Sequence, residues 1–187
     1  MGFAAAHRAV LTAHPSTVGD VVRGLAVHVL IEEPGILRLV YALDADLSRV
    51  RVPSSRAGSR TDGLWRHTCF EAFVAPAGAP GYCELNFTPS LDWDIYRFAA
   101  YREGMLSAHI TRAPQICVRR ADGGLELDSA VRLHELLALG SARRLRLALA
   151  GVVEEDNGRL SYWALRHAPG KPDFHHPEGF ALELALP

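Results

Sequence analysis

Alternating hydrophobic and polar positions dominate the chain. Apolar residues occupy every second position from Leu25 to Ile31, and again from Leu37 to Leu43 after a break at Pro34-Gly35. A period of two is typical of a β-strand with one buried face. These two runs therefore predict a β-hairpin.

Two further hairpins are predicted at turns rich in Gly and Asn, which adopt positive φ angles at little cost. The turns are Asp122-Gly123-Gly124 and Asp156-Asn157-Gly158. The second would join a strand from Leu145 to Val153 to one from Leu160 to His167. Another alternating run, Phe180 to Leu186, follows near the end of the chain.

Short strands separated by turn residues, at intervals of roughly ten residues, are the pattern of a β-sandwich, with a barrel as the alternative. The helical candidate is Ser129 to Leu139, which Ser129 could cap and Gly140 could end, although Val131 and Leu133 would equally continue a strand. No repeat or linker divides the chain; its richest loop is Pro53 to Gly63. We expect one all-β domain over residues 1–187, an antiparallel sandwich with at most one short helix.

Charge and hydropathy narrow the classes of partner. Among 187 residues, 20 basic and 21 acidic side chains leave a net charge of -1, without the basic surface that nucleic acids and anionic membranes select. The apolar start at Phe3–Ala6 is interrupted by His7 and Arg8, and no apolar run is long enough to span a bilayer. We expect neither nucleic acid nor membrane as a partner, and no export signal.

Two strand candidates divide into an apolar and a polar face. The segment from His67 to Val74 places Glu71 on its polar side, and the segment from Tyr82 to Phe87 places Glu84 and Asn86 there. If these strands are neighbours in a sheet, the two glutamates lie side by side.

The three cysteines are Cys69, Cys83 and Cys117. An odd number without a C-x-x-C spacing argues against a disulfide framework and a structural zinc site. In the strand register above, Cys69 and Cys83 also point to opposite faces, which disfavours a bridge between them. We therefore expect three free thiols and a cytoplasmic location.

The polar strand faces offer hydrogen-bonding groups for hydroxyls, and nearby tryptophans offer flat surfaces for stacking, as a sugar or other small polar ligand requires. The alternative is an ordinary solvated sheet face whose carboxylates pair with Arg97 or Arg102. The candidate ligand-binding residues are Trp65, His67, Glu71, Glu84, Asn86, Trp93, Tyr96, Arg102, Lys171, Asp173 and His175.

Catalysis and metal binding are less well supported. Glu71 and Glu84 suggest glycoside hydrolysis by paired carboxylates, but no catalytic serine elbow, P-loop or dinucleotide motif is present. His167, His175 and His176 suggest a metal site, yet adjacent histidines in an extended chain point to opposite sides. We expect no metal site and no enzymatic activity, and the sequence specifies no cofactor.

Prolines and glycines restrict the segment from Pro169 to Gly179. Such a loop holds its side chains in place at a low entropic cost. We expect residues Lys171 to His176 to pack over or beside the polar face and to contribute Lys171, Asp173 and His175 to the site.

Several segments together resemble a known family. Leu64 to Pro76 followed by Tyr82 to Ser90 resembles the DOMON-like domains of bacteria, which are similar to family 9 carbohydrate-binding modules. The resemblance continues through three further parts of the chain, which are Trp93–Phe98, Tyr101–Met105, and Ser161–Leu165 with Lys171–His175.

The resemblance implies an immunoglobulin-like or jelly-roll sandwich whose relatives bind haem or carbohydrate in a pocket on one sheet. Haem-binding relatives ligate iron with Met and His, and Met105 is the one internal methionine here. Carbohydrate-binding relatives clamp sugars between aromatic rings, for which Trp65, Trp93 and Trp163 are available. We therefore expect a non-catalytic module for a sugar-like or other small polar metabolite, with a haem or redox domain as the alternative and a carboxylate-dependent hydrolase third.

Overall fold

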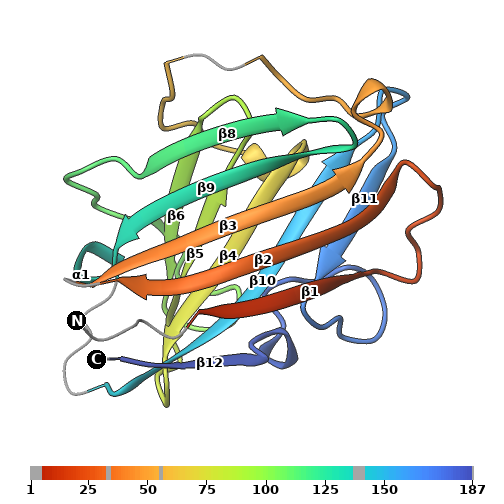
Figure 1. The fold of residues 1–187 in the computed structure, drawn as a ribbon. Helices are drawn as coiled ribbons and strands as arrows, with labels where there is room; N and C mark the ends of the chain where they lie inside the picture. Colours follow the sequence, from red (N-terminus) through yellow and green to blue (C-terminus); the bar gives the residue numbers. More distant parts are fainter. Residues whose placement is uncertain (1–5, 33–34, 55–56, 137–141, 187) are drawn as a thin grey trace.

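Two antiparallel β-sheets pack face to face in the computed structural model, which describes residues 6–32, 35–54, 57–136 and 142–186 (Figure 1). This arrangement confirms the predicted all-β sandwich. The front sheet has the order β1-β2-β3-β9-β8, with the strands β1 (His7–Ala13), β2 (Val22–Glu32), β3 (Ile36–Ala45), β9 (Gly124–Arg132) and β8 (Gln115–Ala121).

The back sheet has the order β7-β6-β5-β4-β10-β11, and β12 pairs with the first half of β10. Its strands are β7 (Leu106–Ser107), β6 (Trp93–Phe98), β5 (Tyr82–Phe87), β4 (Cys69–Pro76), β10 (Arg144–Glu154), β11 (Leu160–Ala164) and β12 (Leu182–Ala185). The helical elements are short: η1 (Leu47–Arg49), η2 (Leu64–Arg66), η3 (Pro177–Gly179) and α1 (Leu133–Leu136). None of the helices in the described ranges is long and apolar enough to cross a membrane.

Strand β1 joins the two sheets along one edge. Its residues from His7 to Leu11 pair with β2, whereas Thr12 and Ala13 pair with β11. The strand order is therefore continuous and the sheet curls back on itself, which protects this edge from pairing with another chain.

All three predicted hairpins are present. Strands β2 and β3 pair from Val22 to Ala45, while the Asp122-Gly123 turn joins β8 to β9 and the Asp156–Gly158 turn joins β10 to β11. Gly123 and Gly158 have φ angles of 92° and 83°, the left-handed conformation that the turn residues predicted. Pro34 lies outside the described residues.

Tertiary pairing shortens the predicted helix. Ser129 to Arg132 belong to β9, because they continue its ladder with β3 as far as the pair Arg132–Ile36. In the described part of the chain the helix is α1, Leu133–Leu136. The rest of the expected helix, 137–139, and its expected end at Gly140 lie outside the described residues.

Tyr41 of β3 connects the front sheet to the back sheet through the core. Its ring is fully buried and stacks on Phe70 of β4 with a centroid distance of 5.1 Å. Its hydroxyl donates a 2.8 Å hydrogen bond to the backbone carbonyl of Glu71. The position of Glu71 in β4 is thus fixed from inside the sandwich.

The outer face of the back sheet is also buried. Both faces of β4 and β5 are covered, unlike the half-solvated sheet face of a simple sandwich. Small residues on the outer face, Ala148, Ala150 and Ala164, leave room for the rings of Phe174 and Phe180. The alternative of a solvated polar face is therefore wrong.

The cysteines are free, as expected, in positions that follow from strand parity. Cys83 points into the core, whereas Cys69 points to the outer face and donates to Asn86 Oδ1. Cys117 is exposed on β8.

We predict that Tyr41→Phe lowers the free energy of unfolding by about 0.5–1.5 kcal/mol, because it removes a buried hydrogen bond while keeping the ring. Urea denaturation measures the difference. Tyr162→Phe is the matched control, since the Tyr162 hydroxyl has no hydrogen-bond partner in the described part of the chain and lies in a half-buried position. Equal stability of Tyr41→Phe and wild type would contradict the role of this bond.

Candidate functional site

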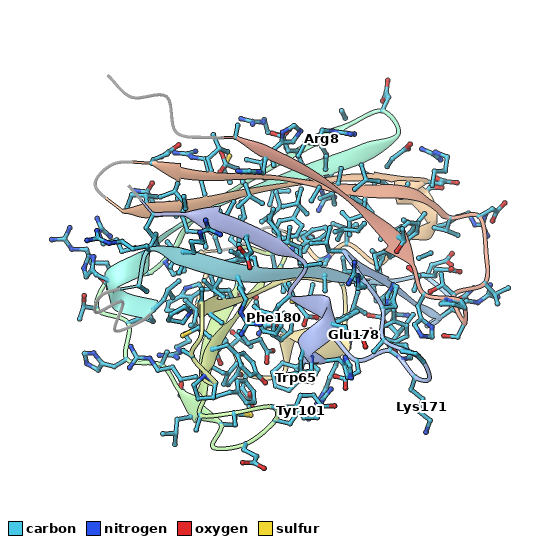
Figure 2. The ribbon with its side chains drawn as sticks, turned by 90° about the horizontal axis from the view of Figure 1, so that it is seen from below. Arg8, Trp65, Tyr101, Lys171, Glu178 and Phe180 are labelled. Atoms are coloured by element: carbon cyan, nitrogen blue, oxygen red, sulfur yellow. The ribbon has the colours of Figure 1, made fainter. Side chains whose placement is uncertain are left out.

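A pocket of about 310 Å³ opens on the outer face of the back sheet. Figure 2 shows Trp65, Tyr101 and Phe180 gathered on this side of the molecule, away from Arg8 on the front sheet. The pocket is lined by Trp65, Glu71, Glu84, Phe98, Arg102, Met105, Val152, Tyr162, Pro172, Phe174 and His175.

Two carboxyl groups from neighbouring strands line this pocket. Glu71 of β4 lies opposite Asn86 of β5, and Glu84 lies opposite Phe73, so the two glutamates are diagonal neighbours on one face. Their residues are only 3% and 4% exposed. The expectation that these two side chains share a face is confirmed.

The two carboxyl groups differ in their hydrogen bonding. Glu84 Oε1 accepts a 2.8 Å hydrogen bond from the Asn86 amide, and Glu84 Oε2 lies 3.5 Å from His175 Nε2. Glu71 Oε1 is buried and has no hydrogen-bond partner among the residues that the structure describes. A buried carboxyl oxygen without a partner costs free energy, so Glu71 is an acceptor available to a ligand.

Burial dominates the ionisation of both groups. It raises the pKa of Glu71 well above its ordinary value, and the negative charge of Glu84 raises it further. Burial also raises the pKa of Glu84 to about 7, although the hydrogen bond from Asn86 opposes this. Burial therefore favours the protonated form of Glu71, and a pKa of about 7 leaves Glu84 close to half ionised at neutral pH.

A hydrogen-bond chain orients His175. The backbone N–H of Arg102 donates to the Tyr82 hydroxyl over 3.2 Å, and this hydroxyl lies 2.8 Å from His175 Nδ1. Because the hydroxyl proton is free to point at Nδ1, the network assigns the imidazole proton to Nε2, which faces Glu84. Burial lowers the pKa of His175 to about 4, so the ring is neutral at neutral pH.

Asp173 connects the loop from Lys171 to His176 to the turn that follows β6. Its Oδ1 accepts hydrogen bonds from Arg102 Nη2 (2.7 Å) and from the backbone N–H of His175 (3.1 Å), and its Oδ2 accepts from the Tyr101 hydroxyl. Burial opposes ionisation, but the Tyr101 and Arg102 bonds prevail and lower the pKa of Asp173. Arg102 has a φ of 56°, a strained value for a residue with a side chain, which this contact helps to hold.

Aromatic rings form the walls. Trp65, from η2, packs edge-on against Tyr96 with a centroid distance of 5.6 Å, and the Tyr96 hydroxyl donates to Asp62. On the other side, Phe174 packs against Tyr162 at 6.3 Å. The rings therefore come from separate elements, each of which is held by its own contacts.

Most of the predicted site residues lie at this pocket. Trp65, Glu71, Glu84, Arg102 and His175 line it. Three others contact lining residues. Asn86 donates a hydrogen bond to Glu84, Tyr96 packs edge-on against Trp65, and Asp173 accepts a hydrogen bond from Arg102. The loop from Lys171 to His176 packs against the polar face, as expected.

Three predicted residues lie elsewhere. Trp93 shares the parity of Ile95 and therefore packs in the core between the sheets, where Arg60 lies 5.4 Å from its ring. The exposed side chain of His67 bonds Glu154 at a separate cavity of about 420 Å³. Lys171 is exposed and projects away from the molecule (Figure 2). Trp163, the remaining tryptophan, also belongs to the core.

Several lining residues were missed by the sequence analysis. Three of them, Phe98, Val152 and Tyr162, lie on strands and could have been identified from strand parity. Phe98 has the same parity as Tyr96, and Val152 pairs directly with Tyr162 on the same outer face. The remaining ones, Met105, Pro172 and Phe174, lie in loops, where no periodic signal exists.

The residues present do not fit haem or a metal ion. Met105 and His175 line the same pocket, but both ring nitrogens of His175 are engaged, one by Tyr82 and one by Glu84. Within the described ranges, no three His, Cys, Asp or Glu side chains form a group that could hold a metal ion.

The fold is shared with known structures, although no family model and no curated protein matches the chain. A candidate carbohydrate-binding protein of Bacteroides uniformis superposes on 97% of this chain and 86% of its own, with a TM-score of 0.72 and 15% identity. A family 9 carbohydrate-binding module of Caldicellulosiruptor kristjanssonii in complex with cellotriose covers 88% of this chain and 74% of its own, with a TM-score of 0.52 and 10% identity.

The same organism's family 9 module in complex with glucose covers 92% of this chain and 80% of its own, with a TM-score of 0.53 and 11% identity. At these identities the similarity establishes the β-sandwich fold, which this chain shares with structures of carbohydrate-binding modules.

The buried carboxyl of Glu71 predicts a pH-dependent stability. A folded-state pKa above the ordinary value of 4.5 means that the folded chain binds more protons than the unfolded chain above that pH, so stability falls as pH rises. Glu71→Gln removes this loss. Its free energy of unfolding relative to wild type should increase as the pH rises above about 5, by up to about 1.4 kcal/mol per pH unit.

Urea denaturation across this range measures the difference. Glu178→Gln, at an exposed position of η3, is the matched control and should follow wild type. Parallel stability curves for Glu71→Gln and wild type would show that Glu71 is ionised in the folded chain.

Proposed function

We propose that this chain is a non-catalytic carbohydrate-binding protein, and that the pocket on the back sheet holds a small sugar. The observation that carries the proposal is Glu71 Oε1, a buried acceptor without a protein partner at a pocket with aromatic walls. Leaving such a group unpaired costs about 1–3 kcal/mol, and a ligand hydroxyl that donates to it would recover this free energy.

The remaining lining suits both surfaces of a sugar ring. The C–H face of a pyranose packs on aromatic side chains, and Trp65, Tyr162 and Phe174 provide them. The hydroxyl groups at the ring edge need donors and acceptors, which Glu84, His175 and Arg102 offer.

The size of the pocket favours a small ligand. Its volume of about 310 Å³ lies at the lower end of the range of roughly 300–1,000 Å³ for small-molecule sites. A single sugar, or the end of a short oligosaccharide, suits this volume better than the middle of a polymer. The proposal includes the cytoplasmic location expected from three free cysteines, where soluble metabolites are the available ligands.

The structures with glucose and cellotriose support this choice of ligand, since both are family 9 modules with the fold described above. The description of these neighbours as carbohydrate-binding proteins and modules supports a non-catalytic role.

We predict that the chain binds glucose or cellotriose, that Trp65→Ala weakens this binding by more than about 1 kcal/mol, and that cellotriose is not cleaved. The variant loses the buried area and the ring contact that Trp65 supplies. Isothermal titration calorimetry measures affinity, and chromatography of cellotriose after incubation measures cleavage.

Trp93→Phe is the matched control, because Trp93 lies in the core and not at the pocket; its affinity should equal that of wild type. The proposal fails if the folded chain binds neither sugar, or if Trp65→Ala binds as tightly as wild type. Release of glucose from cellotriose would contradict the non-catalytic role.

A further inference from the structure

The pocket carries more negative than positive groups. Glu71 and Glu84 both line it and are 3% and 4% exposed. Among the described lining residues the one arginine is Arg102, which bonds Asp173 through both Nε and Nη2. Its charge still lowers the pKa values of Glu71 and Glu84, but burial raises them by more. His175, the nearest other basic group, is neutral because burial lowers its pKa to about 4.

Within the described part of the lining, neither glutamate forms an ion pair with a charged basic side chain. An isolated buried carboxylate is costly, so both groups are driven toward the protonated form when the pocket is empty. A neutral sugar would leave them in that form. A ligand cation would instead provide the missing opposite charge, and an ammonium group has three N–H donors for the acceptors of Glu71 and Glu84.

The walls are compatible with a cation. Trp65, Phe98, Tyr162 and Phe174 line the pocket, and the faces of aromatic rings attract ammonium groups. A sugar that carries an amine therefore combines the two features that the lining offers, a surface for ring packing and a pair of acidic groups.

We propose that the pocket selects a sugar with a protonated amino group, which ion-pairs with Glu71 and Glu84. This inference rests on the proposed sugar-binding function and specifies the class of sugar. Ligand binding then exchanges protons for a cation, since the ammonium group stabilises the ionised glutamates and lowers their pKa values.

Calorimetry with four probes at about pH 6 tests the proposal: glucosamine, glucose, N-acetylglucosamine and cyclohexylamine. We expect glucosamine to bind at least about tenfold more tightly than glucose, since an ion pair in a desolvated site exceeds a neutral hydrogen bond. N-acetylglucosamine, which has lost the charge, and cyclohexylamine, which has lost the hydroxyl groups, should both bind more weakly than glucosamine.

Two further measurements isolate the charge. Titrations in buffers of different ionisation enthalpy should show that glucosamine binding releases protons and glucose binding releases none. Glu71→Gln should reduce the preference for glucosamine over glucose at least severalfold, while Glu178→Gln, at the exposed position, should leave it unchanged.

The outcomes separate the two proposals. Equal affinities for glucose and glucosamine, or an unchanged preference in Glu71→Gln, would overturn the amino-sugar inference and leave sugar binding intact. Binding of cyclohexylamine without binding of any of the sugars would overturn the sugar-binding function. Absence of binding by all four probes would overturn both.

Discussion

Burial of two carboxyl groups on the outer face of β4 and β5 is the constraint on which the site depends. Carboxyl groups at such positions must be protonated, hydrogen-bonded or matched by an opposite charge. Glu84 accepts a hydrogen bond from Asn86 and lies 3.5 Å from His175 Nε2, and the His175 ring is in turn oriented by Tyr82. Glu71 is left with a free oxygen. The unpaired oxygen of Glu71 lowers the stability of the fold, and this oxygen lies at the pocket.

The sandwich supplies both the support and the cover for these groups. From inside, the Tyr41 hydroxyl holds the backbone of Glu71. From outside, Phe174 and Phe180 pack over the small outer-face residues of β10 and β11, and Asp173 anchors their loop to Arg102. Burial of the carboxyls, and with it their raised pKa values, is a consequence of this loop covering a sheet face that would otherwise be solvated.

Strand parity predicted much of the fold and the centre of the site. It placed Glu71 and Glu84 on one face of the sheet and predicted that Cys69 and Cys83 point to different faces, because side chains alternate between the two faces along each strand. The prediction that Trp93 belongs to the site was wrong, because Trp93 shares the parity of Ile95 and lies in the core, although it is close to the polar segments in sequence. The loop from Lys171 to His176 was predicted to pack against this face, but which loop side chains reach the pocket could not be predicted, since the positions of Phe174 and Met105 depend on loop paths that have no periodic signal.

The most direct test of sugar binding at this face is a crystal structure of the chain soaked with glucosamine. We expect the sugar ring in the pocket beside Trp65, with a polar ligand atom within hydrogen-bonding distance of Glu71 Oε1. Glucosamine bound at another surface, with Glu71 still unpartnered, would contradict the assignment of the back-sheet pocket as the binding site.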